Sequence, residues 1–325
     1  MRRFFPLFLL ALSCMMLGGC SGALEKPYNL DTCDAGSVYS SESSLKAAGF
    51  ASSLAVLDPN TSQLNAEGVT ADSFALFNAT DGTVVAQNNA FAKMYPASTT
   101  KILTCLIALE RGNLDDIVTI PEESAITVSG SSMADLKPGD QLSLYDLLCG
   151  LMVPSGNDAA VAIANYISGS VSAFADVMNQ RAEEIGATGS HFVNPHGLPD
   201  ENHYTTVYDM YLIFNEALKN PDFVKIANQS SYTATVTGAD GSKREITWEN
   251  GNAFYAGRFQ LPEGYQILAG KTGHTSAAGF CLVLGEEKND GKQYISIVFK
   301  APTFENLYEG MRTLIGKADE SGTAG

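Results

Sequence analysis

A serine and a lysine, Ser98 and Lys101, stand three positions apart before an apolar run that extends from Ile102 to Leu109. If a helix starts near Ser98, both side chains lie on one face, with Cβ atoms roughly 5–6 Å apart. A serine hydroxyl needs a base to become a nucleophile, and lysine serves as that base only when desolvation lowers its pKa. The apolar run would supply such desolvation. The alternative is an ordinary helix whose first turn carries a solvated lysine.

A second motif, Ser155-Gly156-Asn157, falls in the break between two predicted helices. On its own this tripeptide is a good turn, because all three residue types favour turn conformations. In a functional site, Ser155 would relay a proton, and the amide of Asn157 would orient a substrate or Lys101.

The third motif is Gly270-Lys271-Thr272-Gly273-His274, at the end of a predicted strand. A lysine inside an apolar strand is unusual, and Gly273 allows another backbone to lie close against the strand. Lys271 and Thr272 are able to hold a carboxylate through charge-assisted hydrogen bonds. The alternative is a strand that simply ends in a turn.

Each motif is weak alone, but their order, S-x-x-K, S-x-N and K-T-G, matches the set found in penicillin-binding proteins and class A β-lactamases. The region from about Ala71 to Lys317 resembles the low-molecular-mass penicillin-binding proteins, the serine-type D-alanyl-D-alanine carboxypeptidases of peptidase family S11. The resemblance extends beyond the motifs to Pro96-Ala97-Ser98-Thr99-Thr100-Lys101, Val153-Pro154-Ser155-Gly156-Asn157-Asp158-Ala159-Ala160, Asn194-Pro195-His196-Gly197-Leu198 and Lys271-Thr272-Gly273-His274-Thr275.

The resemblance implies a role for each catalytic residue. Ser98 would be the acylated nucleophile, Lys101 its general base, and Ser155 the group that passes a proton to the leaving D-alanine. The substrate would be a peptidoglycan stem peptide that ends in D-Ala-D-Ala, and β-lactam antibiotics would be covalent inhibitors. We expect neither a cofactor nor a metal ion.

The resemblance also implies how the substrate is held. Asn157 would position it, and the segment Lys271-Thr272-Gly273 would bind its terminal carboxylate. The backbone N–H groups of Ser98 and His274 would form the oxyanion hole.

Two alternatives stay open on the same fold. A class A β-lactamase would carry a Glu-x-x-Leu-Asn stretch, which the sequence lacks, and usually Ser-Asp-Asn in place of Ser-Gly-Asn. A non-catalytic sensor of penicillin or wall peptides would bind without releasing D-alanine. Three histidines, His191, His196 and His203, lie in a Gly/Pro/Asn-rich loop without a zinc-ligand spacing, so we expect them to support turns and hydrogen bonds.

The elements around the motifs predict an α/β (α+β) fold of the β-lactamase/transpeptidase type, an antiparallel sheet flanked by helices plus a helical subdomain. A hairpin comes first, a helical block follows, and a strand-rich region ends in one amphipathic helix. The predicted helices are Ile102 to Leu109, Ser143 to Met152, Asp158 to Ile167, Val171 to Ile185 and Glu305 to Lys317, and the predicted strands are 73–78, 83–86, 232–237, 245–248, 265–272, 280–284 and 294–299.

The N-terminus predicts export. Arg2 and Arg3 precede an apolar stretch that ends in Leu17-Gly18-Gly19-Cys20, which resembles a bacterial lipobox. We therefore expect a signal peptide over residues 1–19 and a lipid on Cys20 that anchors the protein to the outer face of the cytoplasmic membrane, or a periplasmic or wall location. The alternative is a plain secretory signal cut after Ala23. Residues 20–66 would form a tether, 67–318 the catalytic domain and 319–325 a disordered tail.

The net charge bears on the class of binding partner, and the cysteine positions bear on disulfide formation. The net charge is −16 and no basic run is present, which argues against nucleic acid. Of six cysteines, Cys105, Cys149 and Cys281 lie in apolar runs, and none has a C-x-x-C partner. We expect buried thiols, although a disulfide between two of them stays open.

Overall fold

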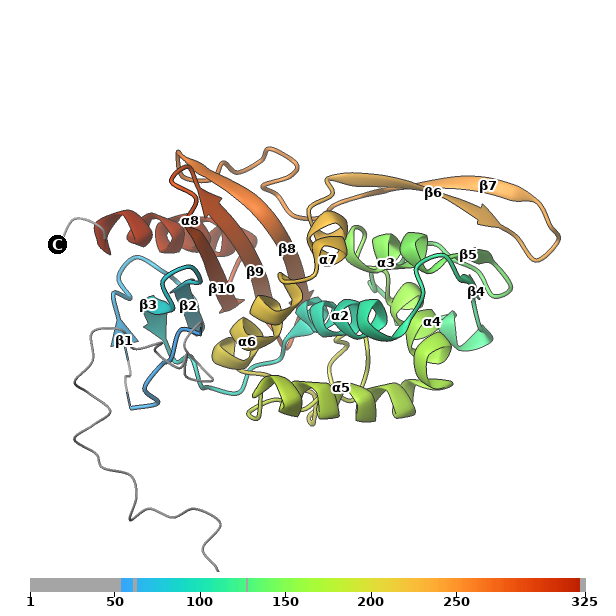
Figure 1. Cartoon of the computed structure of the whole chain (residues 1–325), viewed down its shortest axis with the longest axis horizontal. Helices are drawn as coiled ribbons and strands as arrows, with labels where there is room; N and C mark the ends of the chain where they lie inside the picture. The colour runs from blue at the N-terminus through green and yellow to red at the C-terminus, as the bar shows by residue number, and fades with distance from the viewer. Residues whose placement is uncertain (1–53, 61–62, 127, 322–325) are drawn as a thin grey trace, which may run out of the picture. The chain divides into compact units, whose positions relative to one another are not determined.

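The edge strand that carries Lys271-Thr272-Gly273 belongs to a six-stranded antiparallel sheet (Figure 1). In the computed structural model, residues 54–60, 63–126 and 128–321 are described. The predicted signal peptide, Cys20, Cys33 and most of the tether lie outside the described residues. In spatial order the strands are β1 (Gln63–Leu64), β3 (Thr83–Asn88), β2 (Ser73–Asn78), β10 (Gln293–Ala301), β9 (Gly279–Lys288) and β8 (Tyr265–Thr275).

Apolar side chains alternate along these strands, so each face of the sheet buries its own set. Helix α8 (Phe304–Ser321) covers one face with its apolar side, which consists of Leu307, Tyr308, Met311, Leu314 and Ile315. Helices α2 (Lys101–Arg111) and α6 (Val207–Ala217) pack on the other face, where β2 contributes Ala75 and Phe77. The fold prediction of an antiparallel sheet between helices is confirmed.

The predicted helical subdomain consists of α3 (Leu144–Met152), α4 (Asn157–Ser168), α5 (Val171–Ile185) and α7 (Pro221–Ala227). Helix α3 is capped at its N-terminus, because Ser143 Oγ accepts a hydrogen bond from the Asp146 N–H at 3.0 Å. Within the described residues no single helix is both long and apolar enough to cross a bilayer, and the one pair that qualifies together, α4 and α5, bends by 82°.

A second sheet was only half predicted. The expected hairpin forms as β6 (Ser231–Thr237) and β7 (Lys243–Glu249), but it continues a small sheet with β4 (Ile117–Thr119) and β5 (Gln141–Ser143). Strands of three residues leave no readable alternation in the sequence, so β4 and β5 were missed. The hairpin therefore extends the helical subdomain rather than the main sheet (Figure 1).

The folded region begins earlier in the chain than the expected tether boundary. Ala55 and Leu57 are buried in the core, and the Ala55 N–H donates to the Tyr211 hydroxyl at 2.8 Å. Strand β1 also pairs with β3 before residue 66. At the other end, α8 continues to Ser321, into the segment expected to be a disordered tail. Both segments lack a long periodic pattern, so their packing left little signal in the sequence.

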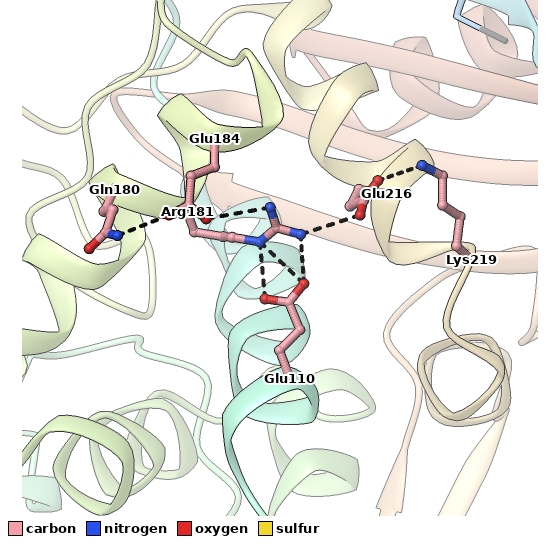
Figure 2. Close-up of polar contacts among 6 residues, drawn as sticks. All are labelled: Glu110, Gln180, Arg181, Glu184, Glu216 and Lys219. Carbon is pink, nitrogen blue, oxygen red and sulfur yellow. Dashed lines mark hydrogen bonds and ion pairs between the residues drawn. The ribbon is translucent and has the colours of Figure 1, made fainter. Parts of the chain in front are cut away.

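An ion-pair network links the helices α2, α5 and α6 (Figure 2). The Arg181 guanidinium of α5 contacts the carboxylates of Glu110 on α2 at 2.8 Å and Glu216 on α6 at 3.3 Å. Lys219 completes the network through Glu216 at 2.6 Å. The Arg181 side chain is only 19% exposed, so solvent screens these contacts less than it screens a surface pair. The network joins the C-terminal end of α2 to α5 and α6.

Candidate active site

Ser98 lies in a 3₁₀ turn, Ala97–Thr100, and α2 begins immediately after it at Lys101. The sequence analysis considered a single helix that starts near Ser98, whereas the structure places Ser98 in this tighter turn and begins the α-helix at Lys101. Ala97 adopts φ +47°, an uncommon conformation for a residue with a side chain. The turn still brings the two side chains together, because Lys101 Nζ donates to Ser98 Oγ at 2.9 Å.

The Lys101 ammonium group is completely buried. It donates to Ser98 Oγ, to Asn157 Oδ1 at 2.7 Å and to the carbonyl oxygen of His196 at 2.9 Å, which uses all three of its hydrogens. Burial is the main cause that lowers the Lys101 pKa well below its usual value, and the positive charge of Lys271 lowers it further. An amine in this state loses its proton readily and then accepts one from Ser98, as a general base must.

Asn157, the first residue of α4, contacts the same lysine, and Ser155 lies two positions before it. Asn157 Oδ1 accepts from Lys101, and the backbone N–H of Asn157 donates to the Ser132 carbonyl at 2.9 Å. Ser155 adopts φ +66°, and its buried Oγ has no hydrogen-bond partner among the described residues. A strained backbone that presents an unpartnered hydroxyl is typical of a functional position. Ser155 therefore stays a candidate for the proton relay that the sequence predicted.

Strand β8 brings the third motif against the serine. A Cβ on Gly273 would lie only 2.9 Å from the Ser98 backbone nitrogen, so this close approach requires glycine. Lys271 is buried, its Nζ donates to the Thr272 carbonyl at 3.1 Å, and burial lowers its pKa to about 7. A carboxylate beside Lys271 would favour its charged form. The ring of His274 stacks on Phe280, with ring centroids 4.2 Å apart.

Two hollows meet at Ser98. The larger, of about 470 Å³, is lined by Asn157, His196 and the segments 128–132 and 274–277, among others. The smaller, of about 280 Å³, is lined by Ser155, Thr272 and several residues of β9 and α8. Both hollows include Ser98 and His274, so the predicted nucleophile and one predicted oxyanion donor lie where the two join.

Comparison with known proteins gives the family. A family model described as D-alanyl-D-alanine carboxypeptidase, peptidase family S11, matches residues 60–303. The D-alanyl-D-alanine carboxypeptidase DacF of Bacillus subtilis is 34% identical over 241 residues, which cover 72% of this chain. The chain belongs to the D-alanyl-D-alanine carboxypeptidase family.

Other members of the family show the same relationship. DacA of Haemophilus influenzae is 32% identical over 73% of this chain, and, as with DacF, the match spans 58% of the relative's own length. The chain thus spans about three-fifths of these relatives. Among solved structures, the Streptomyces K15 DD-transpeptidase superposes with a TM-score of 0.72 at 28% identity, covering 78% of this chain and 98% of that one. Penicillin binding protein 6B from Escherichia coli gives a TM-score of 0.68 at 30% identity, covering 82% of this chain and 80% of that one.

One contact in this family member could not be predicted from its sequence, the bond from Lys101 to the His196 carbonyl. Gly197 permits it, because a Cβ there would lie 1.8 Å from the Ala97 carbonyl oxygen, and the residue adopts φ +87°. Thr104 of α2 holds the same loop by donating to the Pro195 carbonyl at 2.7 Å. The segment around His196 was part of the family resemblance. The sequence could not show that its backbone carbonyl accepts a hydrogen bond, because every residue type has such a carbonyl.

Asp158 was also missed as a contributor to the site. Its buried carboxylate accepts backbone hydrogen bonds from Ala134 at 2.8 Å, Leu136 at 3.0 Å and Ala159 at 2.9 Å. Burial is the main cause that raises its pKa, although these bonds oppose the shift. Asp158 thereby holds the segment that follows Ser132, and Gly130 and Ser132, just before it, line both hollows. The sequence showed only an acidic residue in the first turn of a helix.

No cluster of three or more His, Cys, Asp or Glu side chains suited to a metal occurs in the described ranges. His203 instead joins two segments. Its Nδ1 accepts from the Val193 N–H at 3.1 Å, so Nε2 carries the proton and donates to Thr100 Oγ1 at 2.9 Å. Burial lowers the His203 pKa to about 4, which keeps this neutral form at physiological pH. The described cysteines, Cys105, Cys149 and Cys281, are buried free thiols.

Replacement of Gly273 by alanine tests the close approach of β8 to the serine. We expect Gly273→Ala to slow acylation by penicillin about 100-fold, because the new Cβ must displace Ser98 or the strand by a fraction of an ångström. The rate of labelling by a fluorescent penicillin measures this effect. Gly316→Ala is the matched control, since a Cβ there meets nothing within 4 Å. Equal rates in the two folded variants would contradict the prediction.

Proposed function

We propose that this protein is a serine D-Ala-D-Ala carboxypeptidase that removes the terminal D-alanine from peptidoglycan stem peptides. The observation that carries the proposal is the fully buried Lys101, whose Nζ lies 2.9 Å from Ser98 Oγ. Membership of the family supports the substrate class. The relatives named above are D-alanyl-D-alanine carboxypeptidases, and one structural neighbour is a DD-transpeptidase.

Acylation begins when neutral Lys101 accepts the proton of the Ser98 hydroxyl. Ser98 Oγ then bonds to the carbonyl carbon of the penultimate D-alanine, and the carbonyl oxygen gains negative charge. The backbone N–H groups of Ser98 and His274 are proposed to stabilise that charge. Their placement depends on the contact of Gly273 with the Ser98 backbone.

Departure of the terminal D-alanine requires a proton on its nitrogen. Ser155 is proposed to relay this proton from Lys101, because its Oγ lies unpartnered in the hollow that also contains Ser98. The C–N bond breaks, and the acyl group stays on Ser98 as an ester. Water then adds to the ester carbon, and the shortened peptide leaves with Ser98 restored.

Substrate orientation is assigned to Asn157, Lys271 and Thr272. Lys271 would gain a proton when a carboxylate binds, since burial alone lowers its pKa to about 7. The Thr272 hydroxyl would donate to the same carboxylate. β-Lactams carry a carboxylate beside a reactive amide, so the same steps make them covalent inhibitors.

Ser98→Ala tests the nucleophile. We expect release of D-alanine from a peptide ending in D-Ala-D-Ala to fall by a factor on the order of 10⁴ or more, because no oxygen remains to form the ester. Mass spectrometry of penicillin-treated wild-type protein should place the label on Ser98. Stable labelling without release of D-alanine would favour a sensor, and rapid loss of the label would favour a β-lactamase.

Lys101→Arg tests the base. Arginine keeps the charge but holds its proton at every accessible pH, so acylation by penicillin should fall to background. In the wild type, the acylation rate should rise with pH as Lys101 loses its proton and level off well below pH 10.5, because burial lowers this pKa. Lys292→Arg, at an exposed ion pair, is the control and should acylate normally. A rise that continues to pH 10.5 would contradict the assignment.

The protein is further proposed to be exported and held on the outer face of the cytoplasmic membrane by a lipid on Cys20. The support is the sequence Leu17-Gly18-Gly19-Cys20 after a basic and apolar start. A lipid anchor would keep the domain near its polymeric substrate without a spanning helix.

Cys20→Ala tests the anchor in cells. We expect the variant to move from the membrane fraction to the soluble exported fraction, because no acceptor for the lipid remains. Fractionation followed by penicillin labelling measures the distribution, with Cys33→Ala as the matched control. Unchanged membrane association of Cys20→Ala would refute the lipid anchor.

A further inference from the structure

The smaller hollow beside Ser98 has one wall of a different character from the rest of the site. We call it the aromatic hollow, and its apolar wall consists of Phe280 on β9 with Phe304, Leu307 and Tyr308 on α8. The lining also includes the hydroxyl residues Ser155 and Thr272. The volume is about 280 Å³, which is far more than a methyl group fills.

The apolar wall is preformed. Leu307 and Tyr308 are 2% and 1% exposed, and the Tyr308 hydroxyl accepts from the Ala253 N–H at 2.9 Å. The ring of Phe304 lies against Tyr308, with centroids 4.8 Å apart, and meets Phe280 edge-on. A ligand group that enters the hollow therefore meets fixed aromatic surfaces and orders few new side chains.

The charge of the aromatic hollow is also distinctive. None of its lining residues in the described part of the chain is a lysine, arginine, aspartate or glutamate. The Arg258 guanidinium lies over the Phe304 ring at 5.0 Å but is not part of the lining. A charged side chain placed in the hollow would lose its hydration without gaining an ionic partner.

The position of the hollow identifies which part of a substrate it faces. Ser155 is the proposed proton donor to the leaving nitrogen, and Thr272 the proposed partner of the terminal carboxylate. Both line the aromatic hollow, whereas Asn157 lines the larger one. The two hollows join at Ser98, so the leaving residue and the acyl part of the substrate lie on opposite sides of it.

We propose that the aromatic hollow binds the side chain of the leaving C-terminal D-residue and prefers an apolar side chain larger than methyl. This inference rests on the proposed carboxypeptidase function. Each additional methylene that the hollow buries improves kcat/KM by about a factor of four. A leucine side chain has three more carbons than alanine. Partial burial of these carbons gives an expected gain on the order of tenfold.

Three peptides that differ only in the last residue test the proposal. The full-length protein is given substrates that end in D-Ala-D-Ala, D-Ala-D-Leu and D-Ala-D-Glu, and kcat/KM is measured for release of the last residue. We expect D-leucine to be released about tenfold more efficiently than D-alanine, and D-glutamate less efficiently than D-alanine. Release of D-alanine with no gain for D-leucine would overturn this inference and leave the proposed function intact. No release from any peptide would contradict the proposed function and the inference with it.

Two variants that each remove one aromatic ring then test whether the preference for D-leucine arises in the aromatic hollow. Phe304→Ala should reduce the D-leucine to D-alanine ratio to near one, because it removes part of the wall. Phe259→Ala removes an equal ring that contacts Phe304 and Tyr308 but does not line the hollow, and it should keep the ratio within about twofold. Equal loss in both variants would overturn the proposal. If Phe304→Ala does not label with penicillin, the comparison of the three peptides with the wild-type protein still decides the question.

Discussion

The buried ammonium group of Lys101 is the interaction on which the site depends. Its three hydrogen bonds reach three separate segments of the chain, the turn at Ser98, the start of α4 at Asn157 and the loop at His196. A buried charge is tolerated only when such partners are present, so the folded state needs all three segments in place. The same burial lowers the pKa of the group. One arrangement thus both holds the segments together and prepares the base.

Glycines set the spacing of these segments. A Cβ would collide with neighbouring backbone at Gly273 beside Ser98, at Gly197 beside Ala97 and at Gly156 beside Gly150. At each point two backbone segments approach more closely than any side chain allows. The polar groups that act on a substrate are therefore placed largely by backbone contacts. Their precision comes from the rigid sheet and helices on both sides.

Much of the site was predictable because side-chain identity carried the signal. Ser98, Lys101, Asn157 and Lys271 could be singled out, since a nucleophile, a base, an amide and a buried cation have distinctive types and spacing. The main strands and long helices were predictable from their alternating or helical patterns. Helix α6 was missed although Thr206 and Asp209 form a cap at its start, because its central residues, Met210 to Phe214, are all apolar and show no clear period.

The unpredicted parts share a physical cause, which is that they depend on contacts between distant segments. Any residue type could supply the backbone carbonyl that His196 offers to Lys101. The loop that contains Ala134 and Leu136 takes its conformation only when their N–H groups bind the distant carboxylate of Asp158. The short strands β4 and β5 gain their conformation from pairing. The intrinsic conformational preferences of the residues at these positions were too weak to predict the conformation that the structure shows.

The contribution of α8 to the wall beside Ser98 has a consequence for how the protein matures. Ser98 and Lys101, the proposed nucleophile and base, precede Lys271 by about half of the chain, and Phe304 and Tyr308 come later still. During synthesis from the N-terminus, the chain therefore carries Ser98 and Lys101 long before the strand and helix that complete their surroundings exist. Contacts between such distant segments form late in folding, because the intervening loop must close first. In a nascent chain Ser98 therefore lacks the surroundings that are proposed to activate it, and these form only when folding is complete.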